Sequence, residues 1–285
     1  MIVIELRTPA QIEQMKPAGV FVGEVLTALQ AAAAPGVNLL ELDALAHQMI
    51  KDRGAESCYI DYHPSFGAMP FGKVLCTSVN DAVLHGLPFD YTLVDGDLLS
   101  VDFAVSVDGW VSDSALSVVV GDGDPKDQKL IDITTQALDA GIEAAQAGNR
   151  IGDISHAIEV VAKRNGLKVN TQFGGHGVGR TMHGDPHVPN AGKPGRGFKL
   201  EPGLVIAIER GSCTPRTRST STPTAGPSGR PTARAVPTWS TPSRSPRTAH
   251  SSSPHAEATT MHEYDAAAAE MARASRTSVS TGSRW

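Results

Sequence analysis

The fold is decided by residues 98–120, which read LLSVDFAVSVDGWVSDSALSVVV. Two runs of alternating residues, rich in valine, flank the dipeptide Asp108-Gly109. Alternation with a period of two is typical of β-strands, and Asp-Gly is a favoured two-residue hairpin turn. We therefore predict an antiparallel β-hairpin whose turn is formed by these two residues.

This turn determines which residues face each other across the hairpin. Asp102 is predicted to pair with Ala115, and Asp113 with Ala104, so that the two carboxylates lie on one face, one diagonal step apart. The other residues of that face are mostly small: Ser100, Ala104, Ser106, Val111, Ala115 and Ser117. The opposite face is apolar and is predicted to be buried, with Val101, Phe103, Val105, Trp110, Leu116 and Val118. Because neighbouring carboxylates repel unless a cation or proton lies between them, the pattern predicts either a cation site or the solvated face of an edge hairpin.

Further polar residues stand at turns and strand ends elsewhere in the chain. His85 lies in the turn-like segment LHGLP, His176 in the glycine-rich GGHGVG, and His183 seven residues later. Glu209 closes the apolar run 204–208. Each of these residues is compatible with ordinary polar surface. Taken together, however, two Asp, a His and a Glu form a hard-ligand set suited to Mn²⁺, Fe²⁺, Co²⁺ or Zn²⁺, and carboxylates that bridge two such ions can activate water for hydrolysis.

Helix and strand signals alternate along the rest of residues 1–209. Residues 8–11, TPAQ, combine an N-cap, a proline at the first helical position and a capping-box glutamine, so a helix is predicted from there to about residue 34. Asn38 repeats the capping signal for a helix that ends at Gly54. Two further helices are predicted at 125–147 and 151–165. Strands are predicted at 73–79 and 204–209, and the glycine-rich segment 172–179 is predicted to be a strand followed by a loop. This mixture of helices and antiparallel strands predicts an α+β fold.

Composition excludes several classes of protein. The 285 residues are 40% hydrophobic and carry a formal net charge of −5, which argues against nucleic acid as a specific partner. No apolar run approaches the ~18 residues of a membrane helix, and residues 1–17 lack the apolar segment of a secretory signal. Three cysteines, an odd number, do not form a disulfide scaffold and favour a reducing compartment such as the cytoplasm.

Residues 210–285 differ in composition from the rest of the chain. They hold 14 Ser, 13 Thr, 8 Pro and 10 Arg but no Lys, Leu, Ile or Phe. Ten arginines against four acidic residues give this tail a formal charge of +6 and leave −11 on residues 1–209. A segment with so few large apolar residues cannot bury enough surface to offset the entropy of ordering. We therefore predict a folded domain over residues 1–209 and a low-complexity, disordered tail over 210–285.

The motifs of residues 1–209 resemble the type I methionine aminopeptidases of the bacterial kind. The resemblance rests on the order and spacing of five segments: CTSVNDAVLHGLP at 76–88, GDLLSVDF at 96–103, VSDS at 111–114, GGHGVGRTMHGDP at 174–186 and IAIE at 206–209. It implies the pita-bread fold, with two pseudo-related halves around a curved antiparallel sheet. It also implies a cytoplasmic, monomeric enzyme that works near the ribosome and removes the initiator methionine from the N-terminal Met peptides of nascent chains. A small second residue is preferred in this family, and neither a membrane nor a specific nucleic acid is an implied partner.

The resemblance further implies a metal centre. Two divalent ions of the Co, Mn, Fe, Zn or Ni class would be bound by four residues of this sequence. Asp102 would chelate one ion and Asp113 would bridge both, while His176 and Glu209 would ligate the second ion.

Substrate contacts are implied in the same way. His85 and His183 would be catalytic residues that also bind substrate without being metal ligands. His183 would hydrogen-bond to the peptide, and His85 would position it and help to stabilise the transition state. The methionine pocket would be lined by residues whose sulfur and aromatic groups suit an unbranched thioether: Tyr62, Phe71, Cys76 and Met182.

Two alternatives stay open. The first is another pita-bread peptidase, of the aminopeptidase P or prolidase type, although such enzymes normally carry an N-terminal domain for which residues 1–209 leave no room. The second is a catalytically inactive pita-bread module that binds a peptide or a partner without turnover.

The sequence departs from the family pattern after Glu209. The family carries a fifth ligand, a second bridging Glu in a run that reads approximately AHxEHTVAVT, and the chain contains no such run. A shift of the reading frame by one base turns the codons of residues 237–246 into codons that can spell AHVEHTVAVT, and those of 210–213 into codons that can spell PWFM. We therefore expect that one base is missing next to the codon of Glu209 and that the chain as written is inactive or nearly so.

Overall fold

A computed structural model describes residues 4–62, 70–82, 84–209 and 214–215. Helix α1 (Pro9–Ala32) begins with the predicted capping box, in which Thr8 Oγ1 accepts from the Gln11 N–H at 3.3 Å and Gln11 Oε1 accepts from the Thr8 N–H at 2.9 Å. Helix α2 (Leu39–Arg53) ends at Gly54, whose backbone is left-handed with φ 67°. Both helices confirm the prediction from the sequence.

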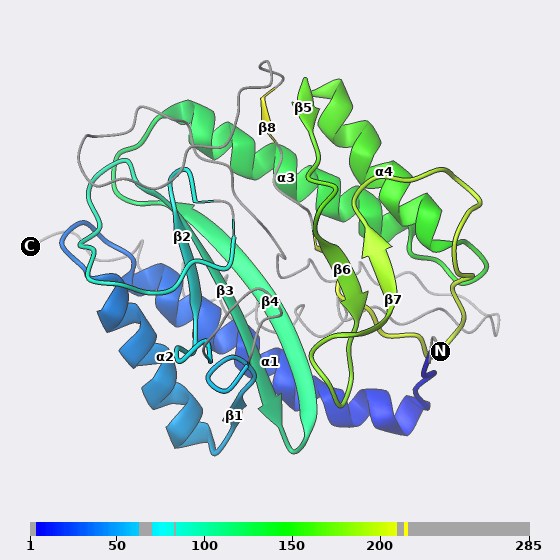
Figure 1. Cartoon of the computed structure of the whole chain (residues 1–285), viewed down its shortest axis with the longest axis horizontal. Coiled ribbons are helices and arrows are strands. Elements are labelled where there is room, and N and C mark those ends of the chain that lie inside the picture. Colours follow the sequence, from blue (N-terminus) through cyan, green and yellow to red (C-terminus); the bar gives the residue numbers. More distant parts are fainter. Residues whose placement is uncertain (1–3, 63–69, 83, 210–213, 216–285) are drawn as a thin grey trace, which may run out of the picture.

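The first half of the molecule is an antiparallel sheet backed by these two helices. Its strands are β1 (Glu56–Ser57), β2 (Cys76–Val79), β3 (Leu98–Val107) and β4 (Trp110–Val119). Strand β4 pairs along one edge of β3, while β1 and β2 pair with different stretches of its other edge. Helix α1 packs across β3 and β4, and α2 lies beside α1 (Figure 1).

The predicted register of the β3–β4 hairpin is confirmed. Asp102 pairs with Ala115, and Asp113 pairs with Ala104, so both carboxylates lie on one face. Side chains of the other face are buried against α1 and α2 in the main core, which includes Leu99, Val101, Phe103, Val105 and Leu116. The hairpin therefore has a dry core on one side and a polar face on the other.

Trp110 lies outside this main core, although the alternation of residues predicts it there. It packs in a second buried cluster that also holds Val178. Its indole N–H donates to Gln14 Oε1 at 3.3 Å, and the guanidinium carbon of Arg180 lies 3.7 Å from the ring centroid. Because an indole needs an acceptor for its N–H and its ring face attracts a cation, polar partners hold Trp110 at the end of the hairpin.

The second half repeats the order of two helices followed by antiparallel strands. Helices α3 (Pro125–Ala144) and α4 (Ile151–Arg164) pack on each other, and α4 packs on β7 (Gly184–Pro189), which pairs with β6 (Gly174–Gly177). Figure 1 shows this half beside the first. A hydrogen bond of 2.8 Å from the N–H at position 111 to the carbonyl at position 179 joins the two halves. Helices and antiparallel strands are thus mixed, as the α+β prediction requires.

Residues 204–209, predicted to form a strand, are extended but paired only locally. Ile206 bridges Gly177, and Ala207 exchanges backbone hydrogen bonds of 2.7 and 3.2 Å with His176. Leu204, Ile206 and Ile208 of this segment are buried in the core of the second half, whereas Val205 packs in the cluster with Trp110. The pairing carries Glu209, at the end of the segment, to the side of His176.

Strand β2 is shorter than the predicted strand 73–79. The N–H groups of Val74 and Leu75 donate to Asp43 Oδ1, at 3.0 and 3.3 Å, instead of joining the sheet. The strand therefore begins at Cys76.

The predicted tail, residues 210–285, lies outside the described residues except for two positions. These form β8 (Thr214–Pro215), which pairs with β5 (Leu167–Lys168). The boundary at residue 209 and the disorder of the tail stay predictions. No helix in the described parts of the chain is long and apolar enough to span a membrane.

Asp43 is a buried carboxylate on α2 that holds the start of β2, so its removal should destabilise the fold. Asp43→Ala leaves the N–H groups of Val74 and Leu75 without a partner and removes the ion pair with Lys73 Nζ at 3.4 Å. We expect the free energy of unfolding to fall by about 2–4 kcal/mol, measured by urea denaturation. In the control Asp52→Ala, which removes an exposed carboxylate of the same helix, the change should be under about 0.5 kcal/mol. Equal losses in both variants would contradict the role given to Asp43.

Candidate active site and metal centre

One pocket gathers side chains from both halves of the molecule. Ten of the residues that the structure describes line it, and nine of these are predicted from the sequence: Tyr62, Phe71, Cys76, His85, Asp102, Asp113, Met182, His183 and Glu209. The tenth is Tyr59, which the sequence patterns missed. The remaining predicted residue, His176, lies against Asp113 and Glu209. The fold therefore brings all ten predicted residues together.

Asp102 and Asp113 reach the pocket from the two strands of the hairpin. The hairpin face is not an open solvated surface, since the Asp113 side chain is only 9% exposed. Burial, followed by the charges of Asp113 and Glu209, raises the pKa of Asp102 well above its ordinary value. Three carboxylates in one pocket repel one another, so the site favours a proton or a cation among them.

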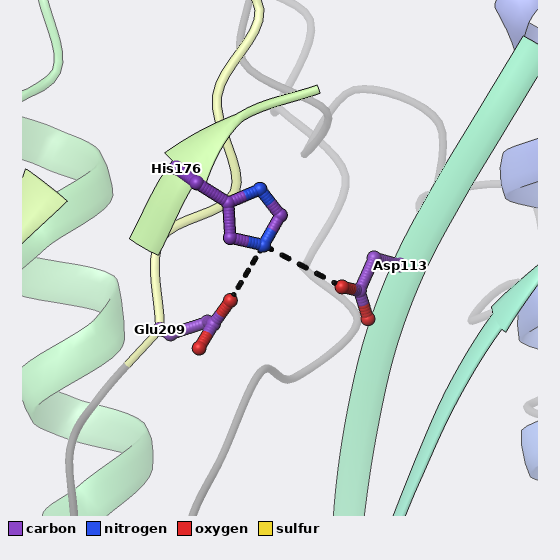
Figure 2. A group of neighbouring side chains, drawn as sticks. All are labelled: Asp113, His176 and Glu209. Atoms are coloured by element: carbon purple, nitrogen blue, oxygen red, sulfur yellow. Dashed lines mark ion pairs between the residues drawn. The ribbon is translucent and has the colours of Figure 1, made fainter. Parts of the chain in front are cut away.

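His176 lies between two of these carboxylates (Figure 2). Its Nε2 is 2.8 Å from Glu209 Oε1 and 3.6 Å from Asp113 Oδ2. Asp113 is on β4, His176 is on β6, and Glu209 ends the segment paired beside β6. Burial acts to lower the pKa of His176, but the two carboxylates outweigh it and raise the pKa to about 11.

The donor atoms of this cluster fit a divalent cation. One ligand atom from each of Asp113, His176 and Glu209 lies within 4.8 Å of the other two. Nδ1 of His176 is 3.0 Å from the Gly177 carbonyl, and because a carbonyl only accepts, Nδ1 carries a hydrogen. Nε2 is buried and faces both carboxylates. A cation in place of the proton on Nε2 would meet one nitrogen and two carboxylates, a donor set suited to Mn²⁺, Fe²⁺, Co²⁺ or Zn²⁺.

Two further histidines of the pocket make contacts between rings. The ring of His183 meets those of His176 and Tyr62 edge-on, with centroids 4.5 and 5.7 Å apart. His85 meets Phe173 edge-on at 5.6 Å, and its backbone is left-handed with φ 56°. Burial lowers the pKa of both residues, and the neighbouring His176 lowers that of His183 further, so both rings are neutral at pH 7. A neutral imidazole offers a ligand one donor and one acceptor nitrogen.

The rest of the pocket wall is aromatic and sulfur-containing. Tyr59 and Phe71 pack edge-on with centroids 5.8 Å apart, in one buried cluster with Cys76 and Met182. Such a wall suits a flexible apolar side chain. The Tyr59 hydroxyl also donates to Asp102 Oδ1 at 3.0 Å, across 43 residues of sequence. No local pattern marks Tyr59, because this contact depends on how β1 and β3 pair.

Comparison with known proteins agrees with this geometry. Residues 13–229 match the model described as Metallopeptidase family M24. The chain is 43% identical over 207 residues to the methionine aminopeptidase of Clostridium perfringens, covering 72% of this chain and 80% of that one. It is 40% identical over 214 residues to methionine aminopeptidase 1 of Mycobacterium tuberculosis, covering 73% and 78%. The chain therefore belongs to metallopeptidase family M24, whose members are metal-dependent hydrolases, and its relatives there include these methionine aminopeptidases.

Solved structures share the fold. The crystal structure of methionine aminopeptidase from Rickettsia prowazekii matches with a TM-score of 0.70 and 32% identity, covering 74% of this chain and 82% of that one. Prolidase from Pyrococcus furiosus matches with a TM-score of 0.60 and 22% identity, covering 72% and 57%, which shows a common fold alone. The pita-bread fold implied by the sequence motifs is confirmed.

Gly175 allows β6 to approach the segment that carries Glu209. A Cβ at this position would lie 2.0 Å from the Ala207 carbonyl oxygen, so Gly175→Ala must push residues 204–209 away from β6. We expect Mn²⁺ affinity, measured by calorimetric titration, to fall at least about tenfold because His176 and Glu209 separate.

The control for this variant is Gly184→Ala in the partner strand β7. Its Cβ would meet the Gly177 carbonyl oxygen at 3.3 Å, a much milder contact. Mn²⁺ affinity should change by less than about twofold. If both variants bind Mn²⁺ as tightly as the unaltered chain, the close approach at Gly175 does not hold the cluster together.

Proposed function

We propose that the site of this chain is built to remove the N-terminal methionine of a polypeptide by metal-assisted hydrolysis of the first peptide bond. The observation that carries the proposal is the meeting of the predicted residues around one pocket. Three carboxylates and His176 lie beside a wall of aromatic and sulfur-containing side chains. The relatives named methionine aminopeptidase, at 40 and 43% identity, support the same conclusion.

The proposed centre holds two divalent ions of the Co, Mn, Fe, Zn or Ni class. Asp102 would hold one ion, Asp113 both, and His176 with Glu209 the second. The buried Nε2 of His176, facing two carboxylates, supports the second position. Ions bound there would act as Lewis acids on the scissile carbonyl and supply hydroxide at neutral pH.

Substrate binding is assigned to the chain's own side chains. The pocket carboxylates would attract the α-ammonium group of a free N-terminus. His183 would hydrogen-bond to the peptide, and His85 would position it and stabilise the charge that develops on the carbonyl oxygen. The thioether of the substrate would be enclosed by the apolar wall, which consists of Tyr62, Phe71, Cys76 and Met182.

The proposed substrates are new polypeptides that start with Met followed by a small residue such as Ala, Gly or Ser. We place this activity in the cytoplasm, near the ribosome, and assign it to a monomer. These assignments are supported by the resemblance of the motifs and, for the compartment, by the odd number of cysteines.

Release of methionine from the peptide Met-Ala-Ser tests the proposed activity. The 285-residue chain with Mn²⁺, assayed at high protein concentration, should release methionine slowly and leave Leu-Ala-Ser intact. EDTA should stop the reaction because it removes the ions. Asp113→Asn should abolish it because the substitution removes the carboxylate shared by both ion positions. The control Asp52→Asn, on the exposed side of α2, should retain the rate of the unaltered chain.

Two results would favour the alternatives instead. Faster cleavage of Ala-Pro than of Met-Ala-Ser would favour a prolidase-type peptidase. Binding of Met peptides without any metal-dependent turnover, even in the chain with the reading frame restored, would favour a module without catalytic activity.

We also propose that residues 210 onward are encoded out of frame and that the chain therefore lacks the second bridging Glu of its family. A centre short of one bridging carboxylate binds a second ion poorly. Resequencing the codons of residues 206–213 should reveal one additional base. Restoring that base should raise Met-Ala-Ser turnover by at least about 100-fold and add a second equivalent of bound Mn²⁺. A 285-residue chain that is as active as the restored chain would refute this proposal.

A further inference from the structure

Tyr59 lies at the junction of the pocket wall and the carboxylates. It follows β1, where its N–H donates to Ser57 Oγ at 3.2 Å. The residue is only 6% exposed, and its ring packs edge-on against Phe71 in the cluster with Cys76 and Met182. The ring is therefore part of the surface that meets an apolar ligand side chain.

The hydroxyl of the same residue reaches the carboxylate face of the hairpin. It donates to Asp102 Oδ1 at 3.0 Å. A phenolic O–H donates and a carboxylate oxygen accepts, so Tyr59 is the donor in this pair. The backbone of Asp102 is already held by pairing with Cys76 on β2 and Ala115 on β4. Strand pairing does not fix the orientation of the Asp102 carboxylate. Tyr59 contacts that carboxylate directly.

Asp102 lies among other carboxylates, so a hydrogen-bond donor such as the Tyr59 hydroxyl is needed to hold its carboxylate in place. Asp113 and Glu209 face the same pocket, and their charges disfavour a third carboxylate there. The hydrogen bond from Tyr59 fixes the direction in which the Asp102 carboxylate points among these groups. Tyr59 donates to Oδ1, one of the two carboxylate oxygens of Asp102.

We infer that Tyr59 is a positioning residue that orients the Asp102 carboxylate toward a metal ion while its ring forms part of the side-chain pocket. The inference rests on the proposed function, because it requires that Asp102 binds an ion. One side chain thereby links recognition of the substrate side chain to the geometry of the metal centre.

Tyr59→Phe separates the two roles, because it keeps the ring against Phe71 and removes only the hydroxyl. In the full 285-residue chain, we expect Mn²⁺ affinity, measured by calorimetric titration, to fall by about 10- to 100-fold, as is usual when a hydrogen bond to a metal ligand is lost. The visible absorption spectrum of the Co²⁺-loaded protein should change as well, because the ligand geometry changes. Circular dichroism should show an unaltered fold.

Tyr91→Phe is the matched control. The Tyr91 hydroxyl also donates to a buried aspartate, with 3.0 Å to Asp97 Oδ2, but neither residue lines the pocket. This variant should leave the Mn²⁺ affinity and the Co²⁺ spectrum unchanged. A double variant tests whether Tyr59 acts through Asp102. When Asp102→Asn is already present, adding Tyr59→Phe should cause no further loss of Mn²⁺ affinity.

The outcomes distinguish this inference from the proposed function. If the unaltered chain binds Mn²⁺ and Tyr59→Phe binds it as tightly, the positioning role is overturned and the metal centre stands. The same conclusion follows if Tyr91→Phe weakens binding as much as Tyr59→Phe does. If the unaltered chain binds no Mn²⁺, the metal centre and the inference fail together.

Discussion

The antiparallel pairing of β3 with β4 is the interaction on which the rest of the structure depends. Its two-residue turn sets a register in which the large apolar side chains face α1 and α2 while both aspartates face the pocket. A slip by one residue would exchange the two faces, placing the carboxylates against the helices and the core side chains in the pocket. The stability of the first half and the position of the two pocket aspartates therefore have the same origin.

The second half supplies what the hairpin lacks. Strand β6 and residues 204–209 bring a histidine and a third carboxylate to the open side of the hairpin face, and this approach is close enough to require glycine at position 175. His176 then offers a positive or metal-binding nitrogen between two negative groups. The first half contributes Asp102 and Asp113, and the second half contributes His176 and Glu209. The pocket therefore forms where the two halves meet.

Electrostatic repulsion among the pocket carboxylates explains why a histidine nitrogen and a tyrosine hydroxyl lie beside them. Three carboxylates in a largely buried site are unfavourable unless donors and cations offset their charge. His176 offsets part of it from one side, and the Tyr59 hydroxyl stabilises Asp102 from the other. Members of the M24 family use divalent ions, and an ion bound among these carboxylates would offset the remaining negative charge.

Local chemistry in the sequence determined the hairpin, its register and the starts of the first helices, because a turn dipeptide and a capping box act over a few residues. The family resemblance of the motifs predicted ten site residues, and the fold brings these ten together. Only the tertiary structure decided the contact of Tyr59 with Asp102, the place of Trp110 and the late start of β2. Each depends on a partner far along the chain: Asp102 is 43 residues from Tyr59, Gln14 is 96 from Trp110, and Asp43 is 31 from Val74. A local sequence pattern cannot predict these hydrogen bonds, because the packing of the whole chain determines which distant acceptor meets each donor.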